Sequence, residues 1–271
     1  MYRALYHYIV CSVCCLTLIA GNTVQAKTKK EEPLQVQIVF IGNSISAGAQ
    51  IRDAATYAPP VRTGEHLKAM EGIGDVIISN QAVSGKTTAD FLPSYNTMYP
   101  RITQAADKLT AENKNYKLVF SVMLGTNDSA IKGPTGSPIA PKQYHANLEL
   151  IIDRLIARYP QCIIVLHRPI WYSPNTYNNG ATYLQEGLNR LQNYYPELQA
   201  LVSEYAESHP GHVFMGDESA FDFFRDNAET HFTHERGNAG TFYLHPNQTG
   251  ADILGKYWAD ALYAVLTAPR P

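Results

Sequence analysis

A serine that follows a buried strand is the first residue of this sequence that is able to do chemistry. Residues 38–41 are apolar and mostly β-branched and run into Gly42-Asn43-Ser44, which predicts a strand ending in a tight turn that presents the Ser44 hydroxyl. A serine in such a place can act as a nucleophile if a base removes its proton. It can equally cap the helix that follows. Partners elsewhere in the chain must decide between these two roles.

Three further polar stretches stand beside predicted strands or helices. Gly85 lies in the stretch after the second predicted strand, Asn127 in the stretch after the third, and His245 directly before the last predicted helix. Taken one at a time, each is typical of a turn, a cap or a surface position. Because the carboxyl ends of parallel strands meet at one edge of a sheet, we expect these residues to form one site with Ser44.

Alternating strand and helix patterns predict the framework that positions these residues. Short apolar runs of strand length, most of them continuous as is typical of strands covered on both faces, span residues 36–41, 76–79, 118–124, 162–167 and 213–215. Helical patterns span residues 99–112, 141–159, 183–208, the last interrupted by Pro196, and a final helix after Pro246. This alternation predicts an α/β fold, a flavodoxin-like doubly wound parallel sheet of about five strands sandwiched by helices.

Length and charge narrow the class of protein. The chain has 271 residues, 45% of them hydrophobic, which fits one large globular domain, expected over residues 34–268. The net charge of −2 shows no excess of basic residues of the kind that binds nucleic acid or an anionic membrane surface. We therefore expect a small or neutral partner molecule.

The first 26 residues are typical of an export signal. Arg3 stands near the start, an apolar run reaches Ala20, and Val24-Gln25-Ala26 is a small-residue cleavage site. We expect an exported protein, periplasmic or secreted in a bacterial envelope, with no stable membrane insertion once the signal is removed. A retained N-terminal anchor is the main alternative. Cys162 is the one cysteine beyond this segment, so no internal disulfide is expected.

The four polar stretches, taken in order, carry a family resemblance. Gly42-Asn43-Ser44-Ile45, residues 80–88, Gly125-Thr126-Asn127-Asp128 and residues 242–247 resemble the four blocks of the SGNH hydrolases, also called the GDSL esterase family. The resemblance implies that Ser44 attacks an ester and His245 is the base. It further implies that the oxyanion hole consists of the backbone N–H groups of Ser44 and Gly85 and the side-chain amide of Asn127. This mechanism needs no metal and no organic cofactor.

Two positions depart from the family pattern. Asn43 stands where the family name records Asp, and Phe242 stands where the family usually carries an Asp three residues before the catalytic histidine. Without that carboxylate, we expect a dyad of Ser44 and His245 in which a backbone carbonyl accepts from the imidazole. The alternative is an acid from elsewhere in the chain. The candidates, chosen by position alone, are Asp217, Glu218, Asp222 and Asp226.

The substrate is expected to be a sugar ester. Within the family, Gly-Asn-Ser-Ile paired with Leu-His-Pro-Asn resembles bacterial carbohydrate acetylesterases. Residues 171–180, after the fourth predicted strand, mix aromatic and amide side chains that suit sugar rings, although such a loop can also simply pack on the sheet edge. The substrate contacts we expect from this region are His167, Arg168, Trp171 and Tyr172. The predicted reaction is removal of acetyl groups from a glycan.

Other functions fit the sequence less well. A lysophospholipase or another short-chain acyl hydrolase is the nearest alternative, and a non-catalytic carbohydrate-binding protein on the same fold is a second. A phosphate-binding loop around Gly85 would need a glycine where Asn80 stands. A metal site at His231 and His234 lacks evident further ligands.

Overall fold

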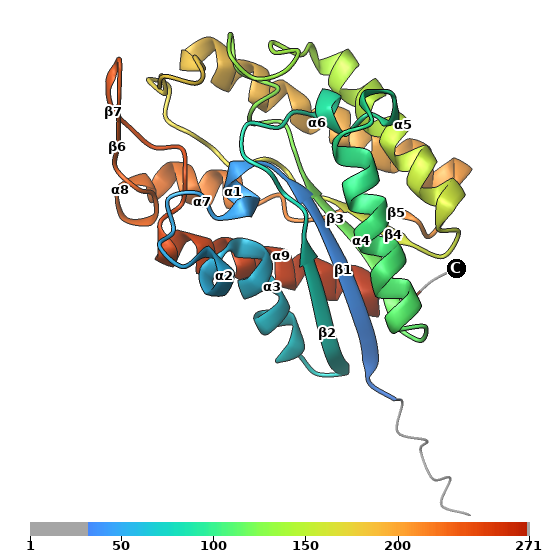
Figure 1. Ribbon diagram of the computed structural model, residues 1–271. Helices are drawn as coiled ribbons and strands as arrows, with labels where there is room; N and C mark the ends of the chain where they lie inside the picture. The colour runs from blue at the N-terminus through green and yellow to red at the C-terminus, as the bar shows by residue number, and fades with distance from the viewer. Residues whose placement is uncertain (1–31, 270–271) are drawn as a thin grey trace, which may run out of the picture. The chain divides into compact units, whose positions relative to one another are not determined.

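A five-stranded parallel sheet with the strand order β2-β1-β3-β4-β5 forms the centre of the fold (Figure 1). The structure is a computed structural model that describes residues 32–269, so the predicted signal segment, residues 1–26, lies outside the described residues. The strands are β1 (Leu34–Gly42), β2 (Ile73–Asn80), β3 (Lys117–Met123), β4 (Ile163–Leu166) and β5 (Val213–Met215). This is the flavodoxin-like order, and it confirms the predicted fold class.

Helices cover both faces of the sheet (Figure 1). They are α1 (Ser44–Ala47), α2 (Ala54–Tyr57), α3 (Pro59–Lys68), α4 (Met98–Glu112), α5 (Pro141–Arg158), α6 (Leu184–Ser208), α7 (Ala220–Asp226), α8 (Ala228–His231) and α9 (Gln248–Thr267), with short 3₁₀ turns η1 (Thr88–Phe91) and η2 (Pro93–Tyr95). Alternate β1 residues face opposite sides, so Val39 and Ile41 pack with α4, α5 and α6, whereas Ile38 and Phe40 pack with α3 and α9. The two cores explain why the strands are mostly apolar on both faces.

Two helical segments differ from the sequence-based expectation. The helix α6 is continuous through Pro196, because burial of Tyr194 and Leu198 on its inner face offsets the backbone hydrogen bond that proline cannot make. The helix α3 was not predicted, because its buried side holds small residues such as Thr63 and Gly64. Close packing of α3 on α9 also depends on a glycine of α9: a Cβ on Gly255 would lie 2.5 Å from the Cβ of Arg62.

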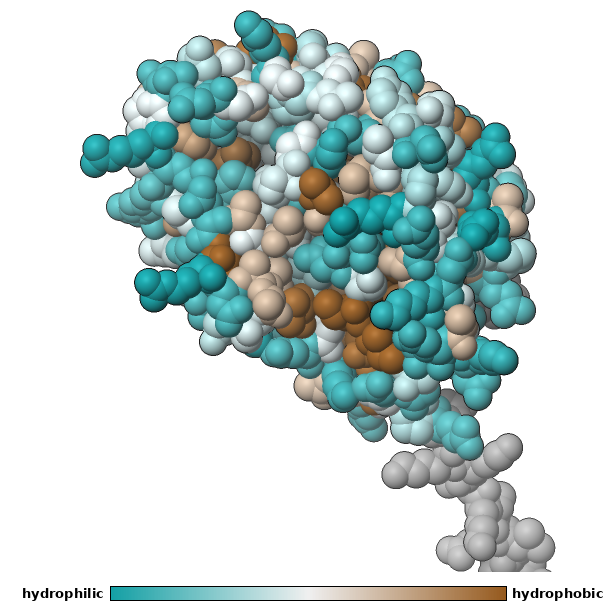
Figure 2. Space-filling view, viewed as in Figure 1, coloured by the Kyte–Doolittle hydropathy of each residue, from teal (hydrophilic) through white to brown (hydrophobic). Residues whose placement is uncertain are grey.

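The edge strand β2 has a partner on one side only within the described chain, where it pairs with β1. Figure 2 shows a mostly hydrophilic face with hydrophobic residues gathered near this strand. The β2 residues Val76, Ile77 and Ile78 are partly buried, and Asp75, paired with Lys68, places charge on the edge. Such a charge is a common way to keep an edge strand from pairing with another chain.

A small antiparallel hairpin, β6 (Glu235–Gly237) and β7 (Gly240–Phe242), lies outside the main sheet and was not predicted. The loop after β4 holds it in place. Asn175 Nδ2 donates to the carbonyl oxygens of Ala239 at 3.2 Å and Thr241 at 2.7 Å, and the Asn238 N–H donates to the Tyr177 carbonyl at 2.8 Å. The hairpin thus depends on this loop rather than on the main sheet.

None of the helices between residues 32 and 269 is long and apolar enough to cross a membrane.

Replacing Asn175 with Ala should loosen the hairpin without unfolding the domain. Each lost hydrogen bond contributes about 1 kcal/mol, so amide hydrogen exchange over residues 235–242 should accelerate by about tenfold or more. Exchange in β1 and β3 should not change, because Asn175 does not contact the main sheet. Equal acceleration in the hairpin and in β3 would show instead that the substitution destabilises the whole domain.

Candidate active site

The turn after β1 presents Ser44 and leaves its hydroxyl available. Asn43 Oδ1 accepts a hydrogen bond from the Ile45 N–H at 3.0 Å, so Asn43 is the N-cap of α1 and Ser44 is the first helical residue. Gly42 is required at the turn because a Cβ there would lie 2.2 Å from Ser46 Oγ. The capping role, which the sequence left open for Ser44, therefore belongs to Asn43.

His245 brings the other end of the chain to this serine. Its Nε2 lies 2.9 Å from Ser44 Oγ although the two residues are 201 positions apart. Two contacts hold His245 in this place: the Thr233 N–H donates to the His245 carbonyl at 2.9 Å, and Asn247 Oδ1 caps α9 by accepting from the Gly250 N–H. Both Ser44 and His245 are 9% exposed, which leaves the pair reachable from one side.

A carboxylate that the sequence analysis missed faces the other imidazole nitrogen. The two carboxylate oxygens of Glu235 lie 2.9 and 3.0 Å from His245 Nδ1, and one of them also accepts from the His245 N–H at 3.1 Å. The expected dyad with a backbone carbonyl on Nδ1 is therefore wrong. Glu235 is directly opposite Phe242 in the β6–β7 hairpin, and opposite residues of an antiparallel pair project to the same face. The acid stands across the hairpin from the position where the family carries it.

A sequence signal for Glu235 did exist. The stretch Gly237-Asn238-Ala239-Gly240 is rich in turn residues and separates two short segments, which is typical of a β-hairpin. Counting back across such a hairpin from Phe242 leads to Glu235.

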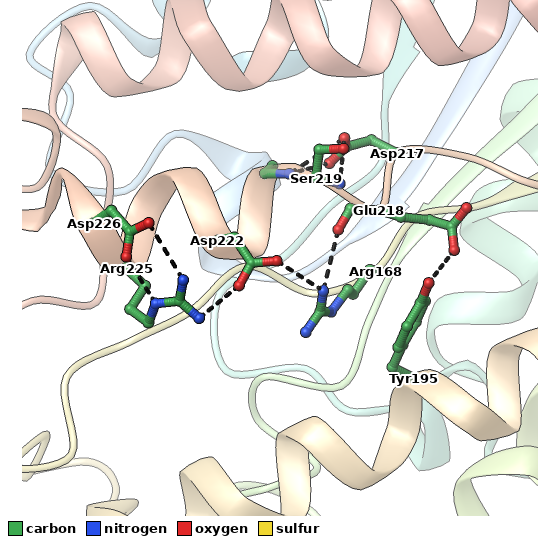
Figure 3. Close-up of polar contacts among 9 residues, drawn as sticks. Arg168, Tyr195, Asp217, Glu218, Ser219, Asp222, Arg225 and Asp226 are labelled. Atoms are coloured by element: carbon green, nitrogen blue, oxygen red, sulfur yellow. Dashed lines mark hydrogen bonds and ion pairs between the residues drawn. The ribbon is translucent and has the colours of Figure 1, made fainter.

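The four acids proposed from position make other contacts, which Figure 3 shows, and none of them bonds to His245. Asp217 accepts from the N–H groups at the start of α7, and the Tyr195 hydroxyl donates to Glu218. Asp222 and Asp226 pair with Arg225. All four follow β5, the far edge of the sheet, whereas Ser44 follows β1 near the centre. This separation explains why the expectation was wrong.

Gly85 and Asn127 lie beside Ser44, as the sequence predicted. Gly85 adopts a φ of +78°, a conformation that favours glycine. The Asn127 amide is fixed from two sides, since Nδ2 donates to the Lys86 carbonyl at 2.9 Å and Oδ1 accepts from the Tyr183 hydroxyl at 2.7 Å. Burial raises the pKa of Tyr183, so its hydroxyl remains a donor. The second Nδ2 hydrogen has no partner within residues 32–269.

One hollow of about 430 Å³ unites these groups. Its walls include Ser44, Gly85, Asn127 and His245. The remaining lining residues are small or neutral: Ala49, Ser84, Gly133, Pro134, Thr135, Asn178, Gly180, Ala181, Tyr183 and Leu244. Among the described residues, no carboxylate, lysine or arginine side chain lines the hollow, so its chemistry suits an uncharged substrate with hydroxyl groups and a small acyl group. We call it the catalytic hollow.

The four expected substrate contacts are not in this hollow. Arg168 lies over the rings of Tyr195 and Phe221, at 4.5 and 4.0 Å. It also donates to the Glu218 carbonyl, a contact that Figure 3 shows. Tyr172 is fully buried, with its hydroxyl 2.8 Å from Ser129 Oγ.

Trp171 and His167 pack elsewhere as well. Trp171 packs against Phe232. His167 is 1% exposed, accepts from the Asp217 N–H through Nδ1 at 3.0 Å and donates from Nε2 to Ser121 Oγ at 2.9 Å. Burial lowers the pKa of His167 to about 3, so it is neutral at ordinary pH. The expectation was wrong because side chains directly after β4 turn into the cores. Residues farther along the same loop, Asn178 and Gly180, do line the hollow.

No cluster suited to a metal ion is found in the described part of the chain, where three or more His, Cys, Asp or Glu side chains do not gather at one point. His231 is hydrogen-bonded to Thr230 and His234 to the Glu229 carbonyl, so each is held by its own neighbours. The catalytic hollow itself offers hydroxyl, imidazole, amide and backbone groups.

Comparison with known proteins agrees with this geometry. The model of the GDSL-like lipase/acylhydrolase family matches residues 40–253. The chain belongs to this family. It is accordingly a carboxylic ester hydrolase, in agreement with the resemblance seen in the four sequence blocks. No curated protein matches the chain.

Several solved structures share the GDSL-like fold at low sequence identity. The carbohydrate acetylesterase Est24 from Sinorhizobium meliloti is 14% identical, with a TM-score of 0.53 over 85% of this chain and 100% of Est24. The acetylxylan esterase Axe2 from Geobacillus stearothermophilus is 16% identical, with a TM-score of 0.52 over 88% and 96%. A lipase/acylhydrolase from Enterococcus faecalis is 19% identical, with a TM-score of 0.51 over 85% and 96%. At these identities the likeness shows the fold.

A pH-dependent stability test follows from the carboxyl group beside Asn127. Asp128 is fully buried and accepts from the Thr88 N–H and hydroxyl, and burial raises its pKa from 3.8 to about 6. Between these two pH values the folded state therefore holds a proton that the unfolded state has lost. The contribution of Asp128 to the free energy of unfolding therefore falls as the pH rises from about 4 to about 6, by up to about 1.4 kcal/mol per pH unit.

The test compares the wild type with Asp128→Asn, which cannot titrate. The unfolding free energy of the wild type minus that of the variant should be larger at pH 4 than at pH 7, as measured by urea denaturation. Asp222→Asn, an exposed carboxylate on α7, serves as the control for the change in net charge. The same difference at both pH values would mean that Asp128 titrates alike in the folded and unfolded chains.

Proposed function

We propose that this protein is a serine esterase that removes short acyl groups, acetyl in particular, from a glycan. One observation carries the proposal: Glu235, His245 and Ser44 form a continuous hydrogen-bonded chain that ends in the catalytic hollow. A serine, an oriented histidine and a carboxylate in this sequence of contacts are the groups that acyl transfer requires.

The first half of the reaction uses these contacts directly. His245 Nε2 takes the proton of Ser44 Oγ as the oxygen attacks the ester carbonyl carbon, and the carbonyl electrons move onto its oxygen. Glu235 keeps the Nδ1–H of His245 in place and stabilises the imidazolium that forms. The imidazolium then gives its proton to the leaving sugar oxygen, which leaves an acyl group on Ser44. Water removes the acyl group by the same steps, with His245 again as the base.

The oxyanion is stabilised by donors that surround Ser44. The Ser44 N–H is at the start of α1, where backbone donors have no partner within the helix. The Gly85 N–H and the second Nδ2 hydrogen of Asn127 complete the set. Because Tyr183 and Lys86 hold the Asn127 amide, this donor needs no reorganisation when charge develops.

The lining of the catalytic hollow supports a sugar ester over a lipid. Thr135 offers a hydroxyl group and Asn178 the N–H groups of its amide, whereas a lysophospholipase needs a long apolar groove for its acyl chain. Est24 and Axe2, which share the fold, are named for carbohydrate and acetylxylan substrates, and this likeness also favours a glycan. Export through residues 1–26 is part of the proposal, since acetylated glycans are polymers of the cell exterior and envelope.

Hydrolysis of nitrophenyl esters tests the mechanism. The wild type should cleave the acetate faster than the butyrate and the octanoate, because the hollow is small, and Ser44→Ala should lose the activity while keeping its circular dichroism spectrum. If the folded wild type is as inert as Ser44→Ala, the esterase proposal fails and a carbohydrate-binding protein takes its place. Faster cleavage of the octanoate would indicate a lipid substrate.

The role of Glu235 has its own test. Glu235→Gln keeps the size of the side chain but removes its charge, so kcat for nitrophenyl acetate should fall by roughly a thousandfold to ten-thousandfold while KM changes little. The matched control is Asp222→Asn, which should lower kcat by less than about tenfold because Asp222 pairs with Arg225 and does not contact His245. Similar small losses in both variants would show that His245 acts without an acid.

A further inference from the structure

A second hollow of about 280 Å³ adjoins the catalytic hollow. The two share the wall residues Gly133, Asn178, Gly180 and Ala181, so only the turn over residues 178–181 and the neighbouring Gly133 separate them. The other lining residues of the second hollow are Lys132, Tyr177, Asn179, Thr182 and Asn238. We call it the distal hollow.

Backbone contacts build the distal hollow from three segments that are far apart in the sequence. The Thr182 N–H donates to the Lys132 carbonyl at 2.9 Å, and the Asn238 N–H donates to the Tyr177 carbonyl at 2.8 Å. Glycines allow the closest approaches, since a Cβ on Gly133 would lie 2.2 Å from the Gly180 carbonyl oxygen. The hollow is therefore shaped by the backbone, which makes it preorganised for a ligand.

The polar side chains of the distal hollow divide into structural and available groups. Asn178 Oδ1 accepts from the N–H groups of Gly180 and Ala181, at 2.8 and 2.9 Å, and so holds the dividing turn. In contrast, the side chains of Lys132, Tyr177, Asn179 and Asn238 make no polar contact with any other residue between 32 and 269. Lys132, Asn179 and Asn238 are exposed to solvent, so the ammonium group, the two amides and the tyrosine ring can exchange water for a ligand. No carboxylate among the described residues lines the hollow.

These groups match the chemistry of a sugar ring. Amides donate to and accept from hydroxyl groups, the ammonium donates, and the tyrosine ring offers an apolar face to ring C–H groups. A purely apolar acyl chain would make no hydrogen bond with any of them. The position matters equally, because a sugar held in the distal hollow would lie next to the one whose ester reaches Ser44.

We propose that the distal hollow binds the sugar that adjoins the acylated one, so that the preferred substrate is an acetylated oligosaccharide or polymer rather than an acetylated monosaccharide. This inference rests on the proposed esterase function and specifies its substrate. The β6–β7 hairpin then serves both hollows, with Glu235 in contact with His245 and Asn238 in contact with the adjoining sugar.

The test compares matched substrates of one and two sugars. Acetylated xylose and glucose are measured against acetylated xylobiose and cellobiose, with nitrophenyl acetate as a substrate that cannot reach the distal hollow. The wild type should show a kcat/KM at least about tenfold higher for the disaccharide of at least one pair. Asn238→Ala and Tyr177→Ala should reduce that preference about tenfold, as expected for loss of one or two contacts, and leave hydrolysis of nitrophenyl acetate unchanged.

A control variant and the failing outcomes separate the two proposals. Asn193→Ala, an exposed asparagine on α6 outside both hollows, should leave every rate unchanged. If the wild type cleaves nitrophenyl acetate but prefers no disaccharide, or if Asn238→Ala and Tyr177→Ala keep the full preference, the distal hollow is not a sugar site and the esterase function stands. If the wild type does not cleave nitrophenyl acetate, the esterase function fails and the inference fails with it.

Discussion

The site depends on one imidazole ring that is held from both sides. His245 contacts Ser44 Oγ through Nε2 and the Glu235 carboxylate through Nδ1, so both ring nitrogens have a hydrogen-bond partner. Because a carboxylate accepts hydrogen bonds, it holds the ring proton on Nδ1. Three separate pieces of chain must meet for this to happen: the start of α1, the strand β6 and the loop before α9. The rest of the fold can be understood as the means of bringing them together.

The core provides that means. The helix α9 packs on α3 and on β1, where Trp258 stacks against Phe40 at a ring separation of 6.0 Å, and this packing places the loop that carries His245 at the carboxyl end of β1. Ser44 follows β1 and Asn127 follows β3, its neighbour in the sheet, so the proposed nucleophile and a proposed oxyanion donor share one edge by topology. The hairpin adds the acid, and the loop after β4 holds the hairpin.

Access distinguishes this site from a second serine and histidine pair in the same protein. Ser121 Oγ and His167 Nε2 are 2.9 Å apart, the same distance as in the candidate active site, yet both residues are buried and His167 Nδ1 accepts from a backbone N–H. Within residues 32–269, no carboxylate bonds to that ring, and neither the catalytic hollow nor the distal hollow reaches it. A serine beside a histidine is therefore not enough to mark a site; the acid and the opening distinguish the pair at Ser44 from the pair at Ser121.

The sequence by itself determined the parts of this protein that depend on short stretches of chain. Apolar runs marked the strands, and turns at the strand ends marked Ser44, Gly85 and Asn127, because parallel strands must deliver such turns to one edge. Tertiary structure alone decided the rest. Glu235 reaches His245 through cross-strand pairing in the hairpin. Side chains after β4, such as His167, are buried because they pack into the cores. The turn residues at 237–240 do indicate a hairpin, but its position against His245 depends on the loop after β4, and the direction of the side chains after β4 depends on the cores. Both depend on contacts between segments distant in the sequence.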